Sequence, residues 1–184
     1  MNEIDALKKT LEALLFASDT PLSVKQLQEI FPELERPAKS VIVAAIQQLN
    51  SDYANSALEL QQVASGWRFQ VKSEMSPWIA RLFAKKPPKY SRAILETIAI
   101  IAYQQPVTRG NIEDIRGVTV SSHMINTLLE REWVKVLGHK EVPGRPALYG
   151  TTKVFLDYFN LSSLDDMPPL QELQNLVTEG ELGV

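Results

Sequence analysis

The chain has 184 residues, of which 45% are hydrophobic, with a formal net charge of -3 and no cysteine. This composition is typical of a globular chain that forms one large or two small cores, and it excludes disulfides and thiolate metal sites. The first residues lack the basic segment of a secretory signal, and the most apolar stretch, residues 94–102, is too short to cross a bilayer. We therefore expect a cytoplasmic protein that makes no membrane contact.

The first half of the chain predicts three helices followed by a β-hairpin. Apolar residues recur at helical spacing over residues 4–17, and "PLSVKQLQEI" begins a short helix in which Ser23 and Gln26 form a capping box. A third helix has one apolar face, made of Val41, Ile42, Ala45, Ile46 and Leu49. Next, "LEL" and "WRFQVK" flank a short turn, and the second alternates apolar and polar residues as a strand does.

A further helix through Trp78, Ile79 and Leu82 follows this hairpin, and Trp78 is expected to seal a core. The next stretch, "KKPPKY", has two adjacent prolines and three lysines, which is typical of a short, semi-rigid hinge. These features predict four segments of the chain. They are an N-terminal domain over residues 1–84, a hinge linker over 85–90, a C-terminal domain over 91–160 and a peripheral, partly disordered tail over 161–184.

The second half repeats the pattern of the first half. "PVTRGNIEDI" matches "PLSVKQLQEI" in its proline, aliphatic, hydroxyl, acidic and isoleucine positions, so Thr108 is expected to cap a helix as Ser23 does. A preceding helix over residues 92–105 has an apolar stripe wider than one core contact requires. Either the small domain surrounds this helix with its own elements, or a partner covers its second side. A third helix follows, with Met124, Ile125, Leu128 and Leu129 on one face.

The second hairpin is predicted from "WVKVLGHKEV" and "ALYGTT", joined by Pro-Gly-Arg-Pro. Pro143 suits the second position of a type II turn and Gly144 the third, where φ is positive, so Arg145 should project from a stiff tip. Trp133 is expected to seal the core of this half. Three helices followed by a hairpin, occurring twice, predict a mainly helical α+β fold with two tandem winged-helix domains, in which each hairpin is the wing.

The charge distribution argues against specific DNA recognition. Residues 1–84 contain 8 Lys and Arg against 10 Asp and Glu, and residues 91–160 contain 8 against 7. The third helix of each half, which would enter the major groove, has few groups that bind phosphates or bases. We therefore expect at most weak, non-specific DNA contact, through Lys85, Lys86 and Lys89. A tandem winged-helix transcription regulator is the alternative function, and it rests on the fold alone.

The sequence also argues against an enzyme. It has no phosphate-binding loop, no metalloprotease motif and no thiol, and His123 and His139 fall on different predicted elements. Two adjacent acid pairs, Glu113 with Asp114 and Asp165 with Asp166, are expected to be solvated charges. We predict no catalytic residue, no metal site and no cofactor, which leaves a protein-binding module.

Several stretches resemble one known family: "EALLFASDTPLS", "LETIAIIAYQQPVTRGNIEDIRGV", "LLERE", "HKEVPGRPALYGTT" and "FLDYFNLSSLDDMPPL". They are similar to segregation and condensation protein B, the ScpB family of bacterial chromosome-segregation factors. The resemblance implies a non-catalytic subunit with two tandem winged-helix domains that dimerises chiefly through its N-terminal domain. It also implies binding to the kleisin ScpA, which bridges an SMC ATPase, and a nucleoid-associated role in chromosome condensation and partition during cell division.

Four side chains of the C-terminal half are predicted to bind the partner. They are large or guanidinium side chains near the hinge of the fold or on the wing, where they can anchor a peptide: Tyr103, Arg116, Arg145 and Tyr149.

Overall fold

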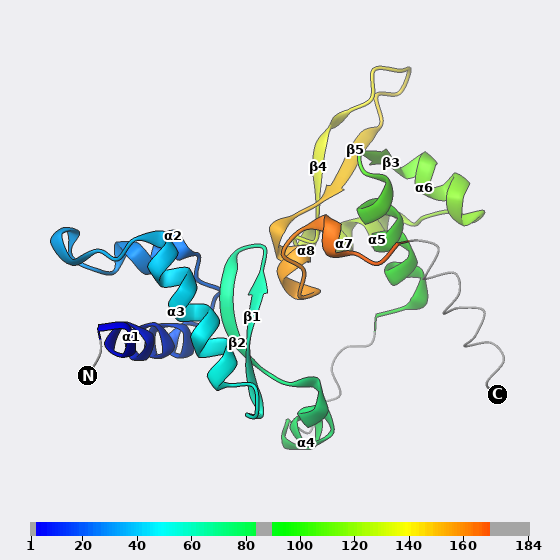
Figure 1. The fold of residues 1–184 in the computed structure, drawn as a ribbon. Helices are drawn as coiled ribbons and strands as arrows, with labels where there is room; N and C mark the ends of the chain where they lie inside the picture. Colours follow the sequence, from blue (N-terminus) through cyan, green and yellow to red (C-terminus); the bar gives the residue numbers. More distant parts are fainter. Residues whose placement is uncertain (1–2, 84–89, 170–184) are drawn as a thin grey trace.

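The computed structural model describes residues 3–83 and 90–169, and it mixes helices with small sheets (Figure 1). The first half consists of α1 (Glu3–Ala17), α2 (Val24–Glu29), α3 (Lys39–Asp52), β1 (Leu58–Val63), β2 (Gly66–Val71) and α4 (Ser76–Leu82). The second half consists of α5 (Arg92–Gln104), β3 (Val107–Thr108), α6 (Arg109–Arg116), α7 (Ser122–Glu130), β4 (Val134–His139), β5 (Ala147–Thr151) and α8 (Lys153–Tyr158). Single 3-10 turns lie at Glu33–Glu35, Ser73–Met75 and Leu164–Asp166.

The core of the first half lies between its three leading helices and the β1–β2 hairpin. Its buried side chains are Leu11, Leu15, Leu27, Ile42, Ala45, Ile46, Leu49 and Leu60. Ser23 begins α2 as predicted, because its hydroxyl accepts from the Gln26 amide while the Gln26 side chain accepts from the Ser23 amide. On α3 the predicted face is buried at four of its five positions, and Val41 is the exception with 42% of its surface exposed.

The core of the second half lies under a three-stranded antiparallel sheet with the strand order β3-β5-β4. Its buried side chains are Ile98, Ile101, Ala102, Val107, Ile112, Val120, Ile125, Leu128, Trp133, Val134 and Phe155. Thr108 caps α6 as predicted, and Asn111 completes a capping box that the sequence reading did not include. The strand β3 was also not predicted, because two residues are too few to show an alternating pattern.

In both halves, the residue directly before the helix cap of the repeated motif pairs with a strand of the hairpin. Leu22, directly before the Ser23 cap, exchanges two backbone hydrogen bonds of 2.9 Å with Trp67 on β2. Val107, directly before the Thr108 cap, pairs in the same way with Tyr149 on β5. Each half therefore ties the start of its second helix to the returning strand of its hairpin.

The tip of the second hairpin has the turn that the sequence predicts. The Arg145 amide donates to the Val142 carbonyl over 2.9 Å, which closes a four-residue turn around Pro143 and Gly144. Gly144 has φ +86°, the value that the third position of a type II turn requires. Arg145 itself has φ +37° and an exposed side chain, so it projects from the tip.

The tryptophan predictions had opposite outcomes. Trp133 is 2% exposed and lies among the rings of Tyr90, Tyr158 and Phe159, which confirms that it seals a core. The same prediction for Trp78 is wrong, since 65% of its surface is exposed on α4. The reason is that α4 lies below the β1–β2 hairpin, beyond the elements that enclose the first core (Figure 1).

Some residues assigned to the hinge and the tail belong to the second core. Tyr90, the last residue of the predicted hinge, packs against that core, as do Leu161 and Met167 of the predicted tail. The rest of the hinge, residues 85–89, lies outside the described residues. The predicted disorder concerns the end of the tail, residues 170–184, which also lie outside them.

Candidate partner-binding surfaces

The four predicted partner-binding residues do not converge on one site. Tyr103 lies at the end of α5, Arg116 at the end of α6, Arg145 at the hairpin tip, and Tyr149 on the middle strand of the sheet. Of these, Tyr103 lines an apolar groove and Arg145 is exposed, whereas the side chains of Arg116 and Tyr149 are already engaged within the second half.

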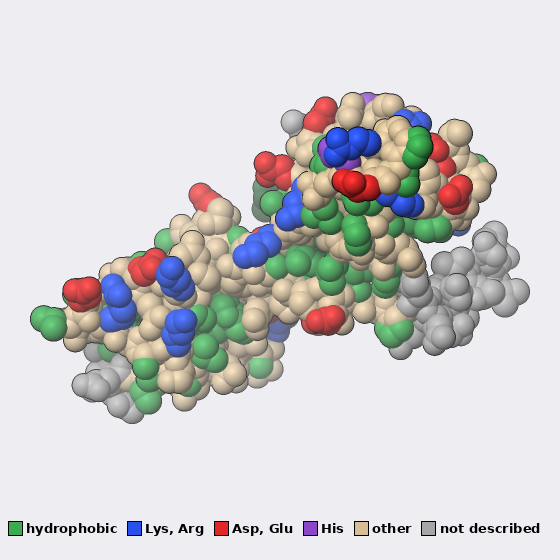
Figure 2. Space-filling model, turned by 90° about the horizontal axis from the view of Figure 1, so that it is seen from above, with side chains coloured by type: hydrophobic (Ala, Val, Ile, Leu, Met, Phe, Trp, Pro, Cys, Tyr) green, Lys and Arg blue, Asp and Glu red, His purple; other side chains and the backbone are tan. Residues whose placement is uncertain are grey.

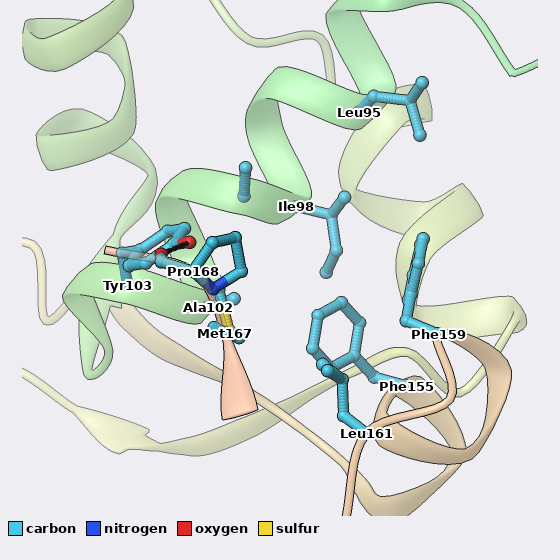
Figure 3. Close-up of a pocket in the computed structure, with 10 residues that line it drawn as sticks. Leu95, Ile98, Ala102, Tyr103, Phe155, Phe159, Leu161, Met167 and Pro168 are labelled. Carbon is cyan, nitrogen blue, oxygen red and sulfur yellow. Dashed lines mark hydrogen bonds between the residues drawn. The ribbon is translucent and has the colours of Figure 1, made fainter. Parts of the chain in front are cut away.

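Tyr103 lies at one end of a groove between α5 and the segment that follows α8 (Figure 3). Its hydroxyl donates to the Pro168 carbonyl over 2.5 Å, and partial burial raises the pKa of this phenol above its ordinary value. The remaining lining is apolar, and the cavity has a volume of about 360 Å³. The lining residues are Leu95, Ile98, Ala99, Ala102, Tyr103, Phe155, Phe159, Leu161, Met167 and Pro168.

This groove explains the wide apolar stripe of α5. Ile98, Ile101 and Ala102 face the core, while Leu95 and Ala99 face the groove, whose opposite wall is α8 and the chain after it. The sequence reading missed α8, although Phe155 and Phe159 stand four residues apart in "FLDYFN" and would share one helix face. The domain's own elements therefore cover part of the stripe, and Leu95 is still 42% exposed.

Arg116 holds α6 against α5. Its side chain is 8% exposed and donates to Glu96 over 3.2 Å, and its Nε is buried without a hydrogen-bond partner among the described residues. Glu96 also accepts a hydrogen bond from Arg92. The bond from Arg92, and after it the bond from Arg116, hold the pKa of the Glu96 carboxyl below its ordinary range. A guanidinium buried in this way is a poor first contact for a partner.

Tyr149 is half-buried and packs against the second core, whereas Arg145 is exposed. Across the sheet Tyr149 stands opposite Val107 on β3 and Val136 on β4. Between Val136 and Gly138 the pairing shifts by one residue, a bulge that increases the local twist of the hairpin. The wing thus exposes Arg145 at its tip, and the ring of Tyr149 is partly buried at its base.

A polar contact joins the two halves of the chain. The Ser65 amide donates to the Asp157 carboxylate over 2.9 Å, and the Ala64 amide donates to the Leu161 carbonyl over 2.9 Å. Arg68 on β2 donates to the Asp157 carbonyl over 3.0 Å and to the Asn160 side chain over 2.5 Å. The turn of the first hairpin is thereby fixed to the end of α8, and sequence patterns within either half could not reveal it.

Exposed apolar side chains gather on α4 and directly after it. Trp78 is 65% exposed, Leu82 74% and Phe83 68%, and the Arg81 guanidinium lies 5.2 Å from the centre of the Trp78 ring. Large apolar side chains grouped in this way on one short helix are typical of a protein–protein contact. The sequence predicted this helix correctly, but it predicted wrongly that Trp78 would be buried.

The charged surface mixes the two signs of charge. On the face seen in Figure 2, Lys and Arg side chains lie among Asp and Glu side chains over both halves. Among the described residues, the ion pairs link Lys8 with Asp52, Lys25 with Glu29, Arg92 and Arg116 with Glu96, and Arg109 with Glu113. Cations paired in this way are less available to neutralise phosphates.

In each acid pair one carboxylate, Glu113 or Asp166, accepts hydrogen bonds within its own half of the chain, so for these two the prediction of a purely solvated charge is wrong. Glu113 accepts from the Val120 amide over 2.8 Å and from Arg109, and these bonds lower the pKa of the Glu113 carboxyl. Asp166 accepts from the Ser162 hydroxyl and from the amides of Ser162 and Ser163, which lowers the pKa of its carboxyl. The acids thus fasten the loops around them.

The described residues contain neither a cluster of metal ligands nor a helix that could span a membrane. Within residues 3–83 and 90–169, no group of three His, Cys, Asp or Glu side chains is placed to hold a metal ion. Over the same ranges, no helix has both the length and the apolar character needed to span a membrane.

Comparison with known proteins identifies the family. The model of the family "Segregation and condensation complex subunit ScpB" matches residues 9–170. The chain belongs to the ScpB family. The match covers both halves, including the hairpin of each half, the contact between the halves and the groove.

Two curated relatives agree with this assignment. A segregation and condensation protein B homolog from Coxiella burnetii is 51% identical over 176 residues, which cover 96% of this chain and 84% of the relative. The segregation and condensation protein B of Syntrophotalea carbinolica is 42% identical over 178 residues, covering 95% of this chain and 87% of the relative. A crystal structure of a dimer of the ScpB N-terminal domain complexed with ScpA peptide is 26% identical, with a TM-score of 0.40, and covers 48% of this chain and all of that one.

Proposed function

We propose that the chain is a non-catalytic adaptor subunit of the bacterial SMC–kleisin complex, which binds the kleisin ScpA in chromosome condensation and segregation. The observation that carries this proposal is the family match over residues 9–170. The paired surface charges support a role in binding protein rather than DNA. The chain would act in the cytoplasm, at the nucleoid, without catalytic chemistry of its own.

We further propose that the chain folds as two tandem winged-helix domains, over residues 1–84 and 91–160. Three observations support this division: the repeated order of helices and hairpin, the two separate cores, and the matching pairs Leu22–Trp67 and Val107–Tyr149. In this arrangement the hairpins β1–β2 and β4–β5 are the wings. Here the fold presents protein-binding surfaces, since a fold does not dictate what its surfaces bind.

The first experiment measures the mass of the purified protein by light scattering, alone and with a central fragment of ScpA, at about 0.15 M salt to screen loose ionic contacts. We expect a dimer that takes up the fragment. A monomer that ignores the fragment would contradict the proposal and favour the transcription-regulator alternative.

The homodimer is proposed to form through α4. Trp78, Leu82 and Phe83 would leave water when a second copy covers them, which provides the apolar area that a stable interface requires. Trp78→Asp should convert the dimer to a monomer in light scattering. Leu34→Asp is the matched control, because Leu34 is fully exposed in the other part of this half and its substitution should leave the dimer intact.

The kleisin contact is proposed to include Arg145 and Tyr149 of the wing, with Tyr103 and Arg116 as further contacts. Arg145 supports the proposal best, because its side chain is exposed on a turn of fixed geometry. Arg145→Ala and Tyr149→Ala should each weaken ScpA binding in titration calorimetry. Since Tyr149 packs on the core, Tyr149→Phe separates loss of its hydroxyl from loss of packing. Unchanged affinity in Arg145→Ala would remove the wing tip from the interface.

A further inference from the structure

The groove beside α5 is an apolar cavity on the surface of the second half, with a volume of about 360 Å³. Its floor consists of Ile98, Ala102 and Phe155, which belong to the core, and its rim consists of side chains that stay in contact with water. Leu95 is 42% exposed on one rim and Phe159 37% on the other. A ligand with apolar side chains would bury both rims and remove them from water.

The chemistry of the groove favours an apolar occupant. The Tyr103 hydroxyl is the polar side-chain group in its lining, and it already donates to the Pro168 carbonyl. A polar ligand would therefore lose its hydrogen bonds with water and gain few in return. An amphipathic helix, which turns its apolar side inward and its polar side outward, fits these requirements.

The chain itself contains a segment of this kind, which follows the groove-lining residues directly in the sequence. The groove wall ends at Met167 and Pro168, and residues 170–184 follow after one further residue. The stretch "LQELQNLV" over residues 170–177 has apolar residues at positions 170, 173, 176 and 177. On a helix these four fall within one apolar stripe, and Gln171, Glu172, Gln174 and Asn175 fall on the opposite side.

Chain connectivity also favours this occupant over a free ligand. A segment tethered one residue from the groove is present at an effective concentration in the millimolar range, without any partner. As a helix, eight residues would span about 12 Å, which suits a short groove formed by a few turns of α5.

We propose that this groove binds residues 170–177 of the same chain as an amphipathic helix that packs against Leu95, Ala99 and Phe159. The segment shields the groove in the isolated subunit. An apolar helix from another protein would reach the same surface only by displacing it. This inference concerns two parts of one chain and does not rest on the proposed function, but a kleisin that contacts Tyr103 inside the groove would have to displace residues 170–177.

The test uses a labelled synthetic peptide of residues 170–184 and a chain that ends at Pro169, in fluorescence anisotropy. We expect the peptide to bind the shortened chain and to bind the full chain at least tenfold more weakly, because the full chain already carries the segment. The peptide with Leu173→Asp and Leu176→Asp should not bind. The matched peptide with Gln171→Asp and Gln174→Asp carries the same added charge on the polar side and should still bind.

A groove variant in the shortened chain completes the test. Ala99→Asp places a charge on the groove wall at a half-buried helix position, so the core below it stays intact. In the shortened chain it should abolish peptide binding while the circular dichroism spectrum is unchanged. Equal peptide affinity for the shortened and full chains, or no binding to either, would overturn the proposal. If shortening instead raises the mass in light scattering and the peptide does not reverse it, the occupant is a second copy and the proposal fails.

Discussion

The guanidinium of Arg68, on β2 of the first half, donates a hydrogen bond of 2.5 Å to the side chain of Asn160, just after α8 of the second half. The same guanidinium donates to the Asp157 carbonyl, and its Nε is buried without a hydrogen-bond partner among the described residues. Asn160 adopts φ +58°, a conformation that asparagine tolerates better than most residues. One side chain thus joins two segments about ninety positions apart in the sequence.

Arg68→Ala should loosen this contact between the halves. Without the guanidinium, the amides of Ala64 and Ser65 should open to solvent more often, and their hydrogen exchange should accelerate roughly tenfold. Mass spectrometry of the peptide that contains both amides measures these hydrogen-exchange rates. Arg36→Ala, an exposed arginine of the same half, is the control and should leave these rates unchanged. Equal rates in the wild type and Arg68→Ala would show that the two backbone bonds hold the contact alone.

Gly66→Ala should destabilise the first half strongly. A Cβ at Gly66 would lie 2.3 Å from the Leu22 backbone, and the φ of +145° is one that residues with a side chain rarely adopt. The free energy of unfolding should fall by more than about 2 kcal/mol in urea titrations. Gly138→Ala on β4 is the matched control, because a Cβ there would meet nothing within 4 Å. Similar losses in both variants would contradict the close approach of Gly66 to Leu22.

Trp133→Ala should cost the second half about 3–5 kcal/mol of stability, since it would leave a cavity among aromatic rings. The measurement is the urea midpoint, followed by circular dichroism. Leu34→Ala removes a large apolar side chain that is fully exposed, so its effect should stay within about 0.5 kcal/mol. A small loss for Trp133→Ala would mean that the aromatic cluster repacks easily.

Glu113 should stabilise the protein in a pH-dependent way. The Glu113 carboxylate accepts hydrogen bonds from the Val120 amide and from Arg109. These bonds, with the Val120 bond as the larger cause, lower the pKa of the carboxyl below the ordinary value of 4.5. The stabilisation is therefore fully present above pH 4.5 and is lost as the pH falls through the folded-state pKa. Glu113→Gln should lower Tm at about pH 7, and the difference from the wild type should shrink near pH 3.

The control for this experiment is Asp114→Asn, which removes the neighbouring charge without touching the Val120 amide. Its effect on Tm should be small at both pH values. A Tm difference for Glu113→Gln that stays constant between the two pH values would show that the lost interaction does not depend on the charge of Glu113.

The sequence by itself determined most local elements of this protein, with β3 and α8 as exceptions. Helix positions followed from apolar spacing, since buried helices require one apolar face, and the caps at Ser23 and Thr108 followed from hydroxyls placed before free amides. The turn at Pro143 and Gly144 followed from backbone preferences that act within a few residues. The family resemblance depended on such local motifs as well, and comparison with known proteins confirmed it.

Only the tertiary structure decided which apolar side chains are covered and where the two halves are in contact. Trp78 and Trp133 are the same residue type on predicted elements, yet one is exposed and the other is buried, because packing depends on elements distant in the sequence. The groove beside α5 and the bond from Arg68 to Asn160 arise in the same way, from segments that no local pattern relates. Local sequence specifies backbone conformation through short-range sterics and hydrogen bonds, whereas a binding surface depends on what long-range packing leaves exposed.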